Sequence, residues 1–132
     1  LAEKEMRPLK PGTWIGHVHV HVNDIEEARV FYSDLLGYPV GMDWSFMGML
    51  DVHFEGEFEH RIAFNGWQGP GATQRPEGTV GLRYFTLVLP GQEELDATLL
   101  RLAAAGVKVE PRDGGQMVAD PSGNRVLLVA KG

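Results

Sequence analysis

The sequence predicts an α+β domain of two βαβββ modules that together form an open, cup-shaped, eight-stranded mixed sheet. Three observations support this fold class. A strand-like alternation is followed by an amphipathic helix and three short strand-like segments. The same order of elements then occurs a second time. A Gly/Pro-rich loop at 66–78 separates the two copies. We therefore expect a single domain at 14–132, with modules at about 14–66 and 80–132.

The first module begins with strict two-residue alternation at 15–22, which is the period of a strand. Valines occupy one face and histidines the other: Val18, Val20 and Val22 opposite His17, His19 and His21. Asn23 is expected to cap a following helix, supported by Glu26 in the manner of a capping box. Apolar residues recur along this helix at core spacing, and Gly37 ends it. Three short strands are then expected near 39–43, 46–54 and 59–64.

The second module repeats this order. Residues 82–89 alternate, with Tyr84 and Thr86 on the face opposite Phe85, Leu87 and Leu89. Leucines at core spacing predict a helix at 92–105, and Gly106 ends it. The remaining strands are expected at 107–110, 116–119 and 126–130. In both modules the apolar strand face should pack on a helix. The histidines of the first strand and Tyr84 and Thr86 should therefore face into the cup.

Composition restricts the possible functions. The chain of 132 residues is long enough for one domain with a substantial core. It contains no cysteine, which excludes disulfides and thiolate chemistry and is consistent with a cytoplasmic protein. A formal net charge of −6 argues against nucleic-acid binding. No apolar run approaches the roughly 20 residues of a membrane helix. The polar segment 1–13 is expected to be an N-terminal arm or an interdomain linker.

Three segments resemble one known family. The runs are IGHVHVHVNDIEEARVFYSDLLGY, HRIAFNGWQGPGATQRPEGTVGLRYFTLVLP and DPSGNRVLLV, and they occur in order from about residue 12 to the end. They are similar to the vicinal-oxygen-chelate superfamily of glyoxalases, bleomycin-resistance proteins and extradiol dioxygenases. The resemblance is greatest to the C-terminal domain of two-domain catechol 2,3-dioxygenases, and segment 1–13 resembles their linker. This implies that the chain is the C-terminal half of a longer protein, which mass spectrometry of the native gene product would test.

The resemblance also implies a metal site. Members of this family hold Fe(II) or Mn(II) on two histidines and one glutamate, and this facial set leaves positions for substrate and O₂. His17 matches the first ligand. Tyr84 stands at the second ligand position and Leu127 at the third, so the ligand set is incomplete. His60 matches the family's acid–base histidine, and Met117 stands where a tyrosine is common.

The incomplete ligand set leads to a ligand pocket rather than a metal centre. We expect the pocket to be lined by residues of the cup and of the adjoining loop: His17, His19, Tyr84, Thr86, Trp67 and Asn65. A hydrogen bond from Tyr84 to His17 would satisfy both polar groups. Neighbouring histidines on one strand lie roughly 6–7 Å apart, which is too far to share one ion without further ligands.

Three functional hypotheses follow. The first is a binding domain for a small aromatic or catecholic molecule, without cofactor, that acts as a silent half or subunit or as a metal-free binder. The second is an active ring-cleaving dioxygenase with Fe(II) or Mn(II) on ligands rearranged among His17, His19, His60, Tyr84 and an acid such as Glu59. The third is a metal-dependent glyoxalase-type lyase or isomerase, although the comparable positions are Ala63 and Leu127. For all three we expect a homodimer or pairing with a homologous domain.

Overall fold

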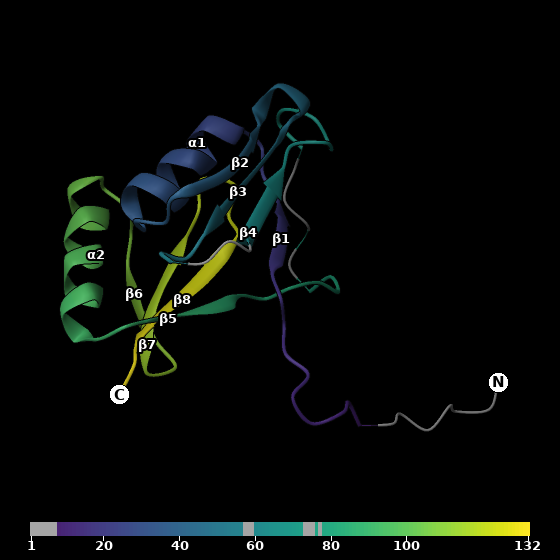
Figure 1. The fold of residues 1–132 in the computed structure, drawn as a ribbon. Helices are drawn as coiled ribbons and strands as arrows, with labels where there is room; N and C mark the ends of the chain where they lie inside the picture. Colours follow the sequence, from purple (N-terminus) through teal and green to yellow (C-terminus); the bar gives the residue numbers. More distant parts are fainter. Residues whose placement is uncertain (1–7, 57–59, 73–75, 77) are drawn as a thin grey trace.

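The computed structural model describes residues 8–56, 60–72, 76 and 78–132. Two modules follow one another along the chain, and each has a four-stranded sheet with a helical segment. Figure 1 shows the two helices next to each other on one side of the molecule. Within the described ranges, no helix is long and apolar enough to cross a membrane.

The first sheet has the strand order β1-β4-β3-β2. Its strands are β1 (Val18–His21), β2 (Val40–Trp44), β3 (Met49–His53) and β4 (His60–Asn65). β1 and β4 are parallel, whereas the other two pairings are antiparallel. The short 3-10 helix η2 (Ser45–Met47) connects β2 to β3. β1 is therefore an edge strand, and its histidines lie at the border of the sheet.

The second sheet repeats this arrangement in the order β5-β8-β7-β6. Its strands are β5 (Phe85–Leu89), β6 (Glu110–Arg112), β7 (Gly115–Ala119) and β8 (Arg125–Ala130). Helix α2 (Gln92–Ala104) lies between β5 and β6 in the chain. β5 and β8 are parallel, as β1 and β4 are in the first module. The two-module βαβββ architecture predicted from the sequence is confirmed, with the eight strands divided between two four-stranded sheets.

The predicted strand faces are confirmed where they form the core. Val20 and Val22 are buried, as are Phe85, Leu87 and Leu89 in the second module. Several strand ends differ from the sequence prediction. β5 begins at Phe85 rather than at 82, and β6 begins at Glu110 rather than at 107.

The N-cap of the helix after β1 lies one residue later than predicted. Asp24, not Asn23, is the N-cap, and its carboxylate accepts the backbone N–H groups of Glu26 and Glu27 at 2.8 and 3.0 Å. The N–H of Asn23 instead donates to the Ser122 hydroxyl at 2.8 Å. The prediction was wrong because either residue type can cap a helix, and the contact with the second module decides between them. Helix α1 (Ile25–Arg29) continues as the π-helix η1 (Val30–Leu35).

A turn at 121–124 connects the second module to the end of β1. The side-chain amide of Asn124 donates to the carbonyl of His21 at 2.8 Å, next to the contact of Asn23 with Ser122. On the helical side, Arg101 of α2 donates to the carbonyl of Leu35 at 2.9 Å. One core cluster contains buried residues from both modules. The modules therefore share one core cluster, and these contacts hold β1 in place relative to the second module.

Candidate functional site

Three imidazole rings of the first module lie near one another: those of His17, His19 and His60. The ring centroids of His17 and His60 are 4.6 Å apart, and those of His17 and His19 are 6.5 Å apart. The second distance agrees with the spacing expected for neighbouring residues on one face of a strand. His17 and His19 are exposed, and His60 is partly exposed. The three rings thus stand side by side in a row and do not converge on one point.

A β-bulge places His60 beside His17. In the β3–β4 pairing Val52 is opposite Ile62, but the next residue, His53, is opposite His60, so Arg61 is the additional residue. Without the bulge, His60 would share the face of Ile62, which is 1% exposed and belongs to the core. The bulge turns His60 toward the cup instead. Sequence reasoning identified the residue but not this cause.

The buried carboxylate of Asp51 lies next to His60. Asp51 is 3% exposed, its Oδ1 accepts the N–H of Met42 at 2.8 Å, and its Oδ2 lies 3.8 Å from Nδ1 of His60. The accepted N–H lies in an irregular part of β2, where the pairing with β3 shifts register. A Cβ atom on Gly41 would collide with Oδ1 of Asp51. Glycine at position 41 therefore leaves space for a buried acid beside the histidine row.

His19 connects the histidine row to the loop after β4. Its Nε2 lies 2.7 Å from the side-chain amide nitrogen of Asn65, and its ring is 6.4 Å from that of Trp67. The Trp67 indole donates to the carbonyl of Met47 at 2.9 Å, yet the residue is 65% exposed. Partial burial, together with the nearby His17 and His60, lowers the pKa of His19. His19 is therefore a mostly neutral hydrogen-bonding group near pH 7.

Tyr84 and Leu127, which stand at the other two expected ligand positions, lie in the second module. The Tyr84 hydroxyl donates to Asp113 at 3.3 Å, so the predicted hydrogen bond to His17 is absent and this prediction was wrong. Tyr84 lies just before β5, where the β6–β7 hairpin offers a closer acceptor. Leu127 is 5% exposed and pairs across the ladder with Met117, which is equally buried. Thr86, opposite Leu127 in β8, is exposed. Leu127 and Met117 thus form an apolar floor, and Tyr84 and Thr86 are the polar residues near its edge.

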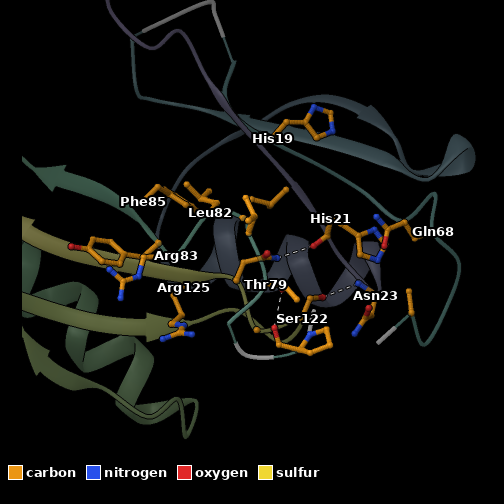
Figure 2. Close-up of a pocket in the computed structure, with 18 of the residues that line it drawn as sticks. His19, His21, Asn23, Gln68, Thr79, Leu82, Arg83, Phe85, Ser122 and Arg125 are labelled. Carbon is orange, nitrogen blue, oxygen red and sulfur yellow. Dashed lines mark hydrogen bonds between the residues drawn. The ribbon is translucent and has the colours of Figure 1, made fainter. Parts of the chain in front are cut away.

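A cavity of about 870 Å³ lies between the two modules. Figure 2 shows its wall, with His19 and His21 from β1 and Arg83, Phe85 and Arg125 from the second module. Of the six predicted pocket residues, His19 and Tyr84 line it. The other four are not among the described residues of its lining: His17, Thr86, Trp67 and Asn65.

Sequence reasoning missed the cationic part of this cavity. Arg83, Arg112 and Arg125 all line it, together with His21. Both ring nitrogens of His21 are buried, and neither has a hydrogen-bond partner among the described residues. The arginines come from three separate segments and have no common motif. The available signal was weak: Arg83 follows the Gly/Pro-rich loop, and Arg125 follows the turn at 121–124.

Comparison with known proteins identifies the family. The family model described as "Glyoxalase/Bleomycin resistance protein/Dioxygenase superfamily" matches residues 14–128. The chain belongs to this superfamily. A superfamily member from Bacillus subtilis (strain 168), catechol-2,3-dioxygenase, is 41% identical over 122 residues. That alignment covers 92% of this chain but only 42% of the relative, so the chain spans less than half of the length of that protein.

Solved structures from the superfamily share the fold at low sequence identity. Lactoylglutathione lyase from Agrobacterium tumefaciens has a TM-score of 0.64 and 20% identity, covering 92% of this chain and 96% of that chain. A glyoxalase/dioxygenase from Nostoc punctiforme has a TM-score of 0.69 and 14% identity, covering 98% of this chain and 99% of that chain. These similarities support the architecture, and they leave the chemistry to the residues of the site.

The metal ions typical of the superfamily do not fit the residues present here. Of the three expected ligand positions, only His17 has a metal-binding imidazole. The Tyr84 hydroxyl is hydrogen-bonded to Asp113, and the Leu127 side chain has no donor atom. Within the described ranges, no three histidine or carboxylate side chains are placed to hold an ion together. Glu59, an alternative acidic ligand, lies outside the described residues.

Proposed function

We propose that this chain is a small-molecule-binding domain of the extradiol-dioxygenase type that has no functional iron centre of its own. One observation carries the proposal: the ligand position on β8 is Leu127, which is buried beside Met117 in an apolar floor. A single histidine does not hold Fe(II) in competition with water, and a facial site needs two histidines and a carboxylate. The domain then acts as a metal-free binder or as the silent half or subunit of a larger assembly.

The length comparison supports the second form of this proposal. The chain spans 42% of its Bacillus relative, which leaves room in such a protein for a second domain of similar size. A silent domain predicts a copurifying homologous domain with the complete two-histidine, one-glutamate set. If the domain acts alone, we expect a homodimer. Light scattering of the purified chain distinguishes these states, and a monomer would remove the homodimer prediction.

The absence of cysteine agrees with a cytoplasmic location, which stays a prediction.

Metal retention tests the proposal directly. The chain is loaded anaerobically with Fe(II) or Mn(II), desalted, and analysed by mass spectrometry for bound metal. The His17→Ala variant is treated in parallel, with His53→Ala as a control at a histidine outside the row. We expect far less than one metal per chain in all three proteins. Near-stoichiometric metal in the wild type and in His53→Ala, but not in His17→Ala, would overturn the proposal.

An active ring-cleaving dioxygenase is the second candidate. The 41% identity to a catechol-2,3-dioxygenase and the contact between His17 and His60 favour it. In this case His60 would move a catechol proton, as a titratable side chain near the substrate can. Oxygen uptake with catechol and a yellow ring-opened product, both lost in His17→Ala, would establish it. No uptake at any Fe(II) loading would leave the binding domain as the function.

A further inference from the structure

The cavity between the modules carries positive charge in an acidic protein. Three of the described lining residues are Arg83, Arg112 and Arg125, and none of the described lining residues is aspartate or glutamate. The whole chain has a formal net charge of −6. A cleft lined by charges of one sign focuses its field and concentrates ligands of the opposite sign. The cavity is therefore electrostatically different from the rest of the surface.

Strand pairing brings two of these arginines to the same end of the cavity. Phe85 pairs with Val126 in the parallel β5–β8 ladder; Arg125 directly precedes Val126, and Arg83 lies two residues before Phe85. Figure 2 shows Arg83 and Arg125 at one end of the pocket, with His21 and Asn23 at the other. Arg83 and Arg125 thus lie at the same end of the cavity.

Arg83 differs from Arg112 in having no carboxylate partner among the described residues. Arg112 is already compensated, because its Nε lies 3.7 Å from the carboxylate of Asp113. Lys108 is the main cause of the lowered pKa of Glu110, and Arg112 and Arg125 contribute less. Arg83 is exposed and forms no ion pair with any described residue. Its guanidinium can therefore bind an oxygen atom of a ligand without losing a protein contact.

The surroundings of Arg83 fit a ligand with an apolar body. Leu82 and Phe85 line the cavity on either side of Arg83 in the chain, and Val80 is a further apolar lining residue. Binding sites for small molecules commonly combine apolar walls with a few placed polar groups that fix the orientation. A guanidinium pairs well with a planar carboxylate, since two parallel N–H groups meet two oxygens.

We propose that the cavity binds a small organic anion, with its carboxylate held by Arg83 and Arg125 and its apolar body against Leu82 and Phe85. This inference rests on the proposed binding function and narrows its ligand class from aromatic molecules in general to organic acids. A phosphate ester presents the same anionic oxygens and belongs to the same class. The site uses arginines of the second module, and neither His17 nor His60 is among the described lining residues of the cavity.

Calorimetric titration of the full chain at pH 7 with benzoate and with benzyl alcohol tests the charge requirement. The two probes share a ring and differ in the anionic group. We expect benzoate to bind at least about tenfold more tightly, as a charge-assisted hydrogen bond provides. Arg83→Gln should reduce benzoate affinity by about tenfold and leave benzyl alcohol unchanged. Lys131→Gln removes one positive charge from an exposed residue outside the described lining and should change neither affinity.

The outcomes separate the two proposals. Equal or tighter binding of benzyl alcohol would overturn the anion inference and leave the binding function in place. An equal loss of benzoate affinity in Lys131→Gln and Arg83→Gln would also overturn it, because a general charge effect would then explain the result. If neither probe binds at millimolar concentration, the binding function fails and the anion site fails with it.

Discussion

The hydroxyl of Tyr32 donates a 2.9 Å hydrogen bond to the carboxylate of Asp120, and this bond joins the two modules. Tyr32 is fully buried, and Asp120 is 4% exposed. The backbone and side-chain amides of Asn124 donate to the same carboxylate at 2.8 Å each. Burial raises the pKa of Asp120 more than these hydrogen bonds lower it. The buried acid therefore depends on a complete set of donors.

Tyr32→Phe is expected to destabilise the domain by about 1–3 kcal/mol, because it leaves a buried carboxylate oxygen without one of its donors. Urea unfolding measures the difference. Tyr38→Phe is the control: Tyr38 is a partly buried tyrosine packed against the same core, but its hydroxyl has no hydrogen-bond partner among the described residues. The control should change stability by less than about 0.5 kcal/mol. Equal losses in the two variants would mean that the Tyr32–Asp120 bond contributes nothing specific.

The fold was predictable because its strand faces have a local signal. Val20 and Val22 alternate with histidines, and the order of strands and helices occurs twice. The errors lie where two local solutions are nearly equal in energy. Asn23 and Asp24 are both good caps, and only the contact of Asn23 with Ser122 in the other module makes Asp24 the cap. A contact across 99 positions leaves no trace in the local pattern.

Only part of the candidate site could be predicted from the sequence, since His19 and Tyr84 are the two of six expected pocket residues among the described lining of the cavity. The resemblance identified His17, His60, Tyr84 and Leu127; the structure places His17 beside His60, Tyr84 in the cavity lining and Leu127 buried in β8. The direction of the Tyr84 hydroxyl depends on Asp113 in the β6–β7 hairpin, which sequence alone could not place beside it. The bulge at Arg61 is likewise a product of the β3–β4 pairing. The direction of a side chain depends on its tertiary neighbours, and the periodicity of the sequence gives no information about which residues these are.

Gly41→Ala should destabilise the domain by about 1–3 kcal/mol, because the new methyl group collides with the buried Asp51 carboxylate. The displaced carboxylate would also weaken its bond with the N–H of Met42 and its contact with His60. The expected readouts are a lower urea midpoint and a changed NMR resonance for the His60 ring. Gly16→Ala is the control, since a Cβ atom at Gly16 meets open space. An unchanged midpoint for Gly41→Ala would mean that β2 adjusts freely around Asp51.

Asp43 gives a pH dependence with a definite sign. Arg29 donates to its carboxylate at 2.6 Å, and this hydrogen bond is the main cause that lowers the pKa of Asp43 from 3.8 to about 2. A lowered pKa in the folded state means that the unfolded chain binds more protons between these two values. The stabilisation is therefore complete above about pH 4 and is lost as the pH falls toward 2.

Asp43→Asn should consequently lower the urea midpoint at pH 7, and the difference from the wild type should shrink between about pH 4 and pH 2. Asp34→Asn provides the comparison, because Asp34 is exposed and has no ion pair or side-chain hydrogen bond among the described residues. It should give little difference at any pH. A difference in urea midpoint between Asp43→Asn and the wild type that stays constant down to pH 2 would contradict the assigned role of the Asp43 charge.

Leu127→Glu restores the residue type that the superfamily resemblance places on β8, and we expect it to harm the protein rather than repair it. Position 127 is 5% exposed beside Met117, so the new carboxylate would be buried without a cationic partner. We expect a loss of about 3 kcal/mol or more at pH 7 in urea unfolding. Burial raises the pKa of such a carboxyl above that of the unfolded chain. The loss should therefore become smaller as the pH falls through the raised value, where the folded state takes up the proton.

Mn(II) should not rescue Leu127→Glu, because Tyr84 still occupies the second histidine position and its hydroxyl is bonded to Asp113. Leu127→Met is the control for side-chain volume and should cost less than about 1.5 kcal/mol. Urea unfolding with and without Mn(II), at a concentration on the order of millimolar, tests for rescue, since a ligand stabilises only a state that binds it. A stabilisation by Mn(II) in Leu127→Glu that is absent from Leu127→Met would mean that His17 and position 127 already point at a common site. The metal centre would then be one residue short of function, and the proposed metal-free role would have to be abandoned.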